Sequence, residues 1–183
     1  SNLNEVFLPN LQTIGKGAFR VTGSIEGFPF ENLKKVPANA FWGSDVYRVN
    51  LDNATSIQGS AFAYCTSLTE VSIPKIETEI NMGSAVFRDC TMLEKVVFNE
   101  NTIYIPEHTF NGCNFSSLDC FDTIETIDNY AFSNNDALTD ITMKSVDYIG
   151  SSAFENCQNA NIIVHNNEEN IVIANAAFSK CNS

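Results

Sequence analysis

The sequence predicts a strand-rich repeat solenoid, and three observations lead to this fold class. Phenylalanine recurs at intervals of 21 to 25 residues along a chain of 183 residues. In most copies a small residue precedes it, and in most copies an apolar run alternating with period two follows it. A period of about 22 residues accommodates one strand and one return segment, which together form one turn of a solenoid. The recurring phenylalanines are Phe19, Phe41, Phe62, Phe87, Phe110, Phe132, Phe154 and Phe178.

The stretch from Ile57 to Pro74 shows the repeat most completely. Two apolar residues precede Phe62: Ile57 by five positions and Ala61 by one. Four follow it at three, six, nine and eleven positions, and they are Cys65, Leu68, Val71 and Ile73. The Val71-x-Ile73 alternation is typical of a strand with one buried face. Pro74 is expected to end the pairing of that strand, because proline has no N–H to donate.

Each complete repeat is expected to supply such a strand. Its inward residues keep these offsets, or come one residue earlier in the second, fifth and seventh repeats, where the turn is shorter. These residues are Leu3, Val6 and Leu8 in the opening strand, then Ile25, Phe28 and Phe30; Val46, Val49 and Leu51; Leu68, Val71 and Ile73; Leu93, Val96 and Phe98; Phe115, Leu118 and Cys120; Leu138, Ile141 and Met143; and Ile162 with Val164. In the seventh repeat the register with Ile163 inward is an open alternative.

The eighth repeat ends with Ile173, Ala177, Phe178 and Cys181, before any strand. Residues 1–183 are therefore expected to form a single domain of about eight repeats, truncated in mid-repeat at both ends. No single repeat can bury its apolar face, so stacking between repeats must stabilise the fold.

The return segment has helix-like spacing and is expected to be a short strand or a single helical turn. Alanine precedes most of the phenylalanines, which indicates a crowded site between neighbouring turns. In the fourth repeat Val86 looks inserted between Ala85 and Phe87, and it is expected to distort this pair.

Five of the six cysteines stand three residues after a repeat phenylalanine, and they are Cys65, Cys90, Cys113, Cys157 and Cys181. They are expected to be buried, reduced thiols, because free cysteine behaves as a small apolar group. Oxidation of neighbours such as Cys65 and Cys90 is an open alternative, since paired strands lie only about 4.8 Å apart. Cys120 falls at an inward strand position.

Composition and charge exclude several classes of function. With 44% apolar and 17% charged residues the chain is expected to fold, and no apolar run approaches the roughly 18 residues of a membrane-spanning helix. The formal charge of −12 argues against nucleic acid and anionic membrane surfaces as partners. The chain begins with Ser1 and shows no signal peptide, so any signal or anchor segment is expected outside it.

No catalytic, cofactor or metal site is predicted. His108 and His165 lie in different repeats, and each is expected to be a solvated surface residue. His108 is close to Cys113 in sequence, but the repeat pattern places that thiol inward, which disfavours a catalytic dyad. Residues 166–170 form the best calcium candidate, and a polar turn is the favoured interpretation.

The unit Ile-Gly-x-x-Ala-Phe-x-x-Cys-x-x-Leu-x-x-Val-x-Ile-Pro resembles the leucine-rich repeat of BspA-like proteins. Residues 14–19, 57–74 and 149–157 carry the resemblance best, and it covers essentially the whole chain. It implies a right-handed leucine-rich-repeat coil with a parallel concave sheet and short helical or extended convex segments. Leu11 or Ile76 stands where better-known leucine-rich repeats have a ladder asparagine, so apolar stacking is expected to replace that ladder.

The resemblance also implies a bacterial or protozoan surface or secreted protein that adheres to host extracellular proteins such as fibronectin and fibrinogen. The family motif forms the scaffold, so it assigns no ligand-contact residue. A fold hosts many functions, and the site must therefore be sought on the outward side of the sheet.

The outward strand residues are the candidate protein-binding face. They are Glu5, Phe7, Arg48, Asn50, Glu70, Ser72, Lys95, Val97, Asp119, Asp140 and Thr142. This mixed surface suits distributed protein recognition better than capture of a small molecule, which favours a concave apolar pocket. The same residues could equally be solvated strand positions. The aromatic residues Phe7, Trp42 and Tyr47 could anchor a partner, or they could equally pack against their own chain at the edge of the sheet.

The predicted function is a non-enzymatic, cell-surface or secreted adhesion module that binds host extracellular or cell-surface proteins. The alternative is a purely structural spacer or self-association module of a larger surface protein.

Overall fold

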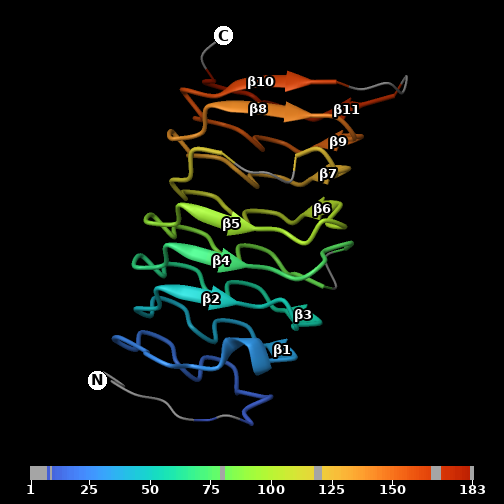
Figure 1. Ribbon diagram of the computed structural model, residues 1–183. Coiled ribbons are helices and arrows are strands. Elements are labelled where there is room, and N and C mark those ends of the chain that lie inside the picture. Colours follow the sequence, from blue (N-terminus) through green and yellow to red (C-terminus); the bar gives the residue numbers. More distant parts are fainter. Residues whose placement is uncertain (1–7, 9, 79–80, 118–120, 166–169, 182–183) are drawn as a thin grey trace.

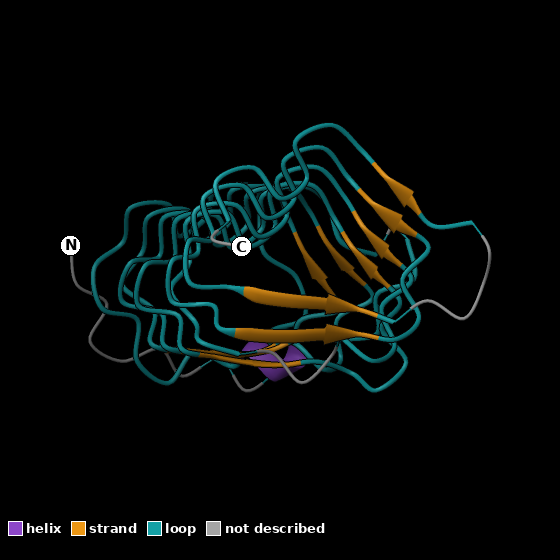
Figure 2. Ribbon diagram, turned by 90° about the horizontal axis from the view of Figure 1, so that it is seen from above, coloured by secondary structure: helices purple, strands orange, loops and turns teal. Residues whose placement is uncertain are grey.

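The computed structural model is a parallel β-solenoid in which successive repeats lie one above another (Figure 1). It describes residues 8, 10–78, 81–117, 121–165 and 170–181. The stack rises from the N-terminal end at the bottom of Figure 1 to the C-terminal end at the top. Viewed along the stack in Figure 2, a layer has two strand-bearing sides and another side built of turns.

The first strand side carries the longer strands. They are β2 (Arg48–Asn50), β4 (Glu70–Ser72), β5 (Lys95–Val97), β8 (Asp140–Met143) and β10 (Asn161–Val164). β4 pairs in parallel with β2 and β5, and β8 pairs in parallel with β10. The central residue of β2, β4 and β5 is a buried valine between two outward residues, which confirms the period-two interpretation.

The second strand side carries the shorter strands. They are β1 (Lys35–Val36), β3 (Ser56–Ile57), β6 (Tyr104–Ile105), β7 (Thr126–Ile127), β9 (Tyr148–Ile149) and β11 (Val172–Ile173). β1 pairs with β3, and β6, β7, β9 and β11 form a second parallel sheet. A single bridge from Ile57 to Met82 continues the pairing beyond β3.

The expected short strand is present only where the return segment begins, at the isoleucine that ends β3, β6, β7 and β9, and the rest of the segment is neither strand nor helix. The residues two before and two after every repeat phenylalanine have φ between +52° and +72°, and thirteen of these sixteen are not glycine. Regularly spaced left-handed residues prevent both a helix and a strand. The segment is instead a chain of turns that is the same in each repeat.

These turns are tied to the next layer by three backbone amides per repeat. The donors are the repeat phenylalanine and the two left-handed residues beside it, and the N···O distances are 2.7 to 3.3 Å. In the second repeat the bonds run from Asn39 to Gly59, from Phe41 to Ala61 and from Gly43 to Ala63. The left-handed conformation therefore serves to turn alternate amides toward the neighbouring layer.

The repeat phenylalanines form one column through the core. Successive rings are stacked with centroids 5.0 to 5.7 Å apart and planes within 15° of each other. The six inner rings are fully buried, whereas Phe19 and Phe178 in the end layers are partly buried. The prediction of equivalent interior positions is confirmed for the inner layers.

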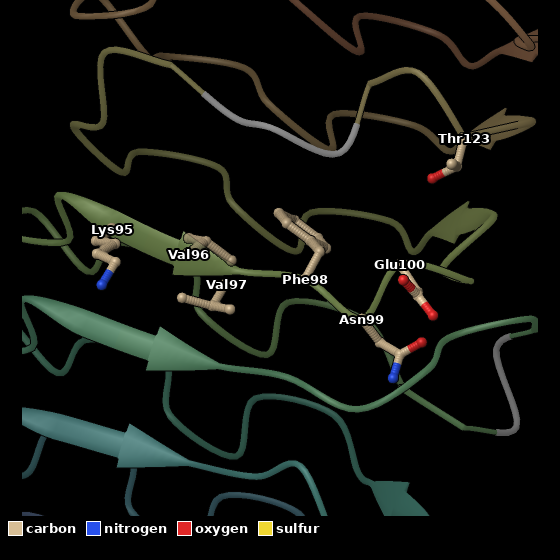
Figure 3. Close-up of a pocket in the computed structure, with 7 residues that line it drawn as sticks. All are labelled: Lys95, Val96, Val97, Phe98, Asn99, Glu100 and Thr123. Carbon is tan, nitrogen blue, oxygen red and sulfur yellow. The ribbon is translucent and has the colours of Figure 1, made fainter.

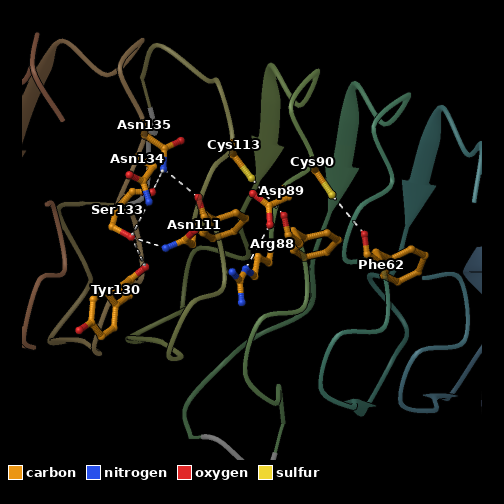
Figure 4. Close-up of polar contacts among 12 residues, drawn as sticks. Phe62, Arg88, Asp89, Cys90, Asn111, Cys113, Tyr130, Ser133, Asn134 and Asn135 are labelled. Atoms are coloured by element: carbon orange, nitrogen blue, oxygen red, sulfur yellow. Dashed lines mark hydrogen bonds and ion pairs between the residues drawn. The ribbon is translucent and has the colours of Figure 1, made fainter. Parts of the chain in front are cut away.

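A second column contains the predicted cysteines. All five are free thiols, and each Sγ donates to the carbonyl oxygen of the phenylalanine in the preceding layer at 3.0 to 3.2 Å. In the sixth repeat Asn135 takes the cysteine position, and its Nδ2 donates to the oxygen of Phe110 at 2.8 Å (Figure 4). The position thus requires a small donor as well as a small volume.

The first repeat lacks its predicted strand. A short 3₁₀ turn, η1 (Phe30–Asn32), stands there instead. Gly27 has a φ of +68° and Pro29 has no N–H, so the backbone leaves the sheet at this point. Phe28 and Phe30 are nevertheless buried, as the repeat pattern predicted.

Val86 is not an insertion. The amide of Phe62 donates to the oxygen of Val86, as the amide of Phe41 donates to that of Ala61. Val86 therefore takes the alanine position, and Thr109 takes it in the next repeat. Both are buried, so this position accepts side chains larger than alanine.

The register favoured for the seventh repeat is confirmed. Ile162 and Val164 pack against the core, whereas Ile163 is 43% exposed. Four expected inward residues lie outside the described part of the chain, and they are Leu3, Val6, Leu118 and Cys120. Leu8 is 44% exposed rather than inward, because it lies at the open end of the described stack.

Candidate functional site

The outward side chains of the first strand side form the strand face. Its described residues from the sequence prediction are Arg48, Asn50, Glu70, Ser72, Lys95, Val97, Asp140 and Thr142. The outward–inward–outward pattern of each strand fixes which side chains reach this face. Glu5, Phe7 and Asp119, also predicted for it, lie outside the described residues.

One row of the strand face carries alternating charge across three layers. Arg48, Glu70 and Lys95 are opposite one another in β2, β4 and β5. The Glu70 carboxylate lies 2.6 Å from Lys95 Nζ and 3.6 Å from Arg48 Nε. The side chains of Arg48 and Lys95 are 81% and 63% exposed, so both cations remain accessible to a partner.

This arrangement affects the acidity of Glu70. The hydrogen bond from Lys95 lowers the pKa of the Glu70 carboxyl, and the positive charges of Lys95 and Arg48 act in the same direction against a smaller opposing effect of burial. Glu70 is therefore charged at neutral pH, and the row keeps its alternating charge. Exposed ion pairs contribute little to stability, so this row is not required by the fold.

The adjacent row is less polar. Asn50, Ser72 and Val97 are opposite one another, and Val97 is 40% exposed. Ser72 Oγ donates to the carboxylate of Asp52, which lies just beyond β2. Together the two rows place charged, amide, hydroxyl and apolar groups side by side, as in many protein interfaces.

A second part of the strand face lies on β8 and β10. Asn161 Nδ2 donates to Asp140 Oδ1 at 3.0 Å, and Ile163 pairs in register with Thr142. The sequence interpretation did not assign Asn161 or Ile163 to the site, although its favoured register for β10 places both outward. The structure brings these four residues together and leaves them separate from the row at Glu70.

Two hollows border the strand face. The first, about 330 Å³, is lined by Phe28, Phe30, Glu31, Arg48, Val49, Asn50, Glu70 and Ser72. The second, also about 330 Å³, is lined by Lys95, Val96, Val97, Phe98, Asn99, Glu100 and Thr123 (Figure 3). Both are open hollows in which charged and polar side chains stand among the apolar ones, so neither encloses a ligand as a typical small-molecule site does.

The candidate aromatic anchors differ in exposure. Tyr47 directly precedes β2 and is 54% exposed. Trp42 lies on the turn side, where the guanidinium of Arg20 sits 4.5 Å from its ring centroid and Tyr64 packs on it at 5.1 Å. Trp42 is thus packed within its own chain, and Tyr47 is the better placed anchor for a partner of the strand face.

Among the described residues the buried thiols are poor nucleophiles. Burial raises the pKa of the Cys65 and Cys157 thiols to about 12 and raises that of Cys113 further. Thiols at such pKa values carry almost no thiolate at neutral pH. A catalytic pair of His108 and Cys113 is therefore not supported.

His108 corrects the expectation of a solvated surface residue. Its side chain is 29% exposed, its ring stacks on Tyr130 at 4.8 Å, and its Nδ1 is buried without a hydrogen-bond partner. Burial lowers the pKa of His108, against a smaller raising effect of Glu107. The ring is accordingly neutral at pH 7 and acts as a packing group.

A family model for the BspA type leucine-rich repeat region matches the chain in six copies, over residues 1–83 and 55–183. The chain belongs to the BspA-type leucine-rich repeat family. This agrees with the resemblance inferred from the repeat unit. A search of curated proteins finds no match for this BspA-type chain.

Two solved structures are similar to the BspA-type chain. A leucine-rich repeat protein from Bacteroides ovatus matches with a TM-score of 0.67 and 25% identity, over 84% of this chain and 39% of that one. A leucine-rich cell surface protein from Faecalibacterium prausnitzii matches with a TM-score of 0.45 and 21% identity, over 73% of this chain and 34% of that one. The chain thus spans less than half the length of either protein.

The described part of this BspA-type chain contains no group of three or more His, Cys, Asp or Glu side chains arranged to hold a metal ion. Within the same residues, no helix is both long enough and apolar enough to pass through a bilayer. The strand face is the site that the described residues support best.

Proposed function

We propose that this chain is a non-enzymatic protein-interaction module that binds a partner through the strand face. The observation that carries the proposal is the row Arg48, Glu70 and Lys95, whose charges alternate at the spacing of adjacent strands. A partner with the opposite alternation can align with this row, and charge complementarity of this kind gives specificity and a faster association rate.

The proposed partner is an extracellular or cell-surface protein of a host or a neighbouring cell, and the proposed location is the cell surface or the secreted fraction. Two features support a protein partner. Tyr47 and Arg48 stand together at the start of β2, and both residue types are enriched among the residues that dominate binding energy. The wide, mixed surface also offers many weak contacts rather than one enclosing pocket.

The first experiment is a binding screen with the 183-residue chain. Biotinylated protein is tested against arrays of extracellular matrix and serum proteins, glycans and bacterial surface proteins. We expect at least one protein ligand. A screen that yields no ligand and only self-association supports the alternative, a structural spacer.

The second experiment exchanges the charges of one ion pair. We expect Glu70→Lys combined with Lys95→Glu to weaken binding of that ligand at least tenfold, about 1.4 kcal/mol, because the order of charges from Arg48 onward changes from plus, minus, plus to plus, plus, minus and no longer alternates. The exchange keeps a Lys–Glu pair but places a lysine opposite Arg48. Arg48 is 81% exposed, and exposed charge pairs contribute little to stability, so the fold should be unaffected.

A matched control exchanges an exposed pair on the turn side. Glu155→Lys with Lys180→Glu, a pair at 3.3 Å, should leave the affinity unchanged. Titration calorimetry gives the affinities, and circular dichroism checks the fold. Equal affinity for the wild type and the strand-face exchange would refute binding through this face.

A further inference from the structure

One edge of β2 lacks a neighbouring strand, although the first and second layers are both described there. The two layers are hydrogen-bonded before β2, where the amide of Asp45 donates to the oxygen of Thr22 at 3.0 Å. They are bonded again after it, where the amide of Thr55 donates to the oxygen of Lys34 at 2.8 Å. Between these points η1 replaces the first-layer strand, and β2 pairs only with β4 among the described strands (Figure 1). The gap is therefore a local feature between two described layers.

This gap leaves backbone groups of β2 without a partner. The amide of Leu51 donates to the oxygen of Ser72 at 2.8 Å, so Leu51 bonds toward β4. Alternate residues of a parallel strand bond to opposite neighbours, and the N–H and C=O groups of Arg48 and Asn50 consequently face away from β4. No described residue makes a hydrogen bond with these groups.

The hollow of about 330 Å³ that borders β2 is lined from both sides of this gap. Phe28, Phe30 and Glu31 come from the first layer, and Arg48, Val49 and Asn50 come from β2. The two phenylalanines and Val49 are buried and contribute apolar surface, whereas the Arg48 side chain is largely exposed. Glu70 also lines the hollow, but its carboxylate is held by Lys95. On the β2 side the hollow thus offers free backbone groups, apolar surface and an accessible cation.

We propose that an extended segment of the protein partner binds along the free edge of β2 as a further strand of this sheet. Its backbone bonds to the N–H and C=O groups of Arg48 and Asn50, as in other cases of strand addition to a sheet edge. Side chains of a strand alternate between its two faces, so a residue beside Arg48 points outward and the next one points inward, like Val49. This geometry selects a segment in which an acidic residue adjoins a large apolar one.

The inference rests on the proposed function, because the hollow and the strand face share Arg48, Asn50 and Glu70. Its test uses a random library of short linear peptides, displayed and selected against the 183-residue chain. We expect the enriched peptides to contain an acidic residue beside a large apolar one. When such a peptide binds, NMR hydrogen exchange should show new protection at the amides of Arg48 and Asn50, which exchange rapidly in the free chain.

Two substitutions of Asn50 separate the role of its amide from that of its side chain. Asn50→Pro removes the N–H from the free edge, and proline is tolerated where that group takes no part in the ladder. This variant should bind the selected peptide about tenfold more weakly, whereas the matched control Asn50→Ala keeps the N–H and should bind it as the wild type does. N-methylation of the peptide tests the same bonds without altering the chain, because only the alternate peptide residues that face β2 should be sensitive to it.

A library that yields no binder overturns the inference, and so does a bound peptide that leaves the amides of Arg48 and Asn50 unprotected. Protection of these amides that rises with chain concentration in the absence of peptide also overturns it, because the occupant would then be a second copy of the chain. The proposed function fails separately. A ligand from the binding screen that is weakened by the exchange at Glu70 and Lys95, but not by Asn50→Pro, removes this inference and leaves the proposed function standing.

Discussion

At the scale of single residues, Asn135 shows what the cysteine position requires. Its Nδ2 donates to the oxygens of Phe110 and Phe132 at 2.8 and 2.7 Å, whereas its buried Oδ1 has no partner. A thiol at this position makes the same bond to the preceding layer without an unpaired oxygen. Serine does the same in the second repeat, where Ser44 Oγ donates to the oxygen of Phe19, so cysteine, asparagine and serine can each supply this hydrogen bond.

We expect Asn135→Cys to leave the free energy of unfolding unchanged or to raise it, because it removes an unsatisfied buried acceptor. Asn135→Ala should lower it by about 1–3 kcal/mol, since it removes the donor and leaves a cavity. Urea unfolding followed by circular dichroism measures both. Equal loss in the two variants would show that the donor is not important at this position.

The sequence could predict most of the residue-scale pattern but not His108. Offsets from the repeat phenylalanine identify inward positions, and these are occupied as expected in the inner layers. His108 stands two residues before Phe110, at a left-handed position with φ of +56°. That conformation brings its ring against Tyr130 of the next layer, and nothing in the spacing of apolar residues indicates this contact.

At the scale of structural elements, glycine marks the places where layers approach most closely. Gly15 and Gly150 stand at the same position of their repeats, four residues before Phe19 and Phe154. A Cβ on Gly150 would lie 2.5 Å from the backbone nitrogen of Asn129, whereas a Cβ on Gly15 would meet nothing within 4 Å. The difference arises because Gly150 packs against Asp128 and Asn129 of the preceding layer, whereas no atom lies within 4 Å of a Cβ on Gly15.

We expect Gly150→Ala to lower the free energy of unfolding by about 1–3 kcal/mol, the usual cost of overpacking. Gly15→Ala should be neutral or raise it by up to about 1 kcal/mol, because alanine restricts the unfolded chain. Thermal and urea unfolding compare the pair. A Gly150→Ala variant as stable as Gly15→Ala would contradict the close approach of these layers.

The strands could be predicted and the turns could not. Period-two alternation places Arg48, Glu70 and Lys95 outward on three strands, and their shared row follows from the repeat. The turn side depends on left-handed residues, and most of them are not the glycines that signal this conformation. Asn161 and Ile163 were missed because a shorter turn left the register of β10 open.

At the scale of the whole molecule, stability is shared between neighbouring layers, since every layer contacts only the layers beside it. Inner layers are covered on both faces and the end layers on one, as the exposures of Phe154 and Phe178 show. The surface is consequently the only part that varies freely from layer to layer. The strand face follows from this arrangement.

Amide hydrogen exchange, measured by NMR at a concentration where the chain is monomeric, tests this architecture most directly. In every inner layer the amides of the repeat phenylalanine and of its two left-handed neighbours should be strongly protected, as at Asn39, Phe41 and Gly43. The equivalent amides of Ala176, Phe178 and Lys180 should exchange rapidly, because none of the described residues accepts a hydrogen bond from them. Protection that does not recur with the repeat, or equal protection in the last layer, would contradict a stack of equivalent layers.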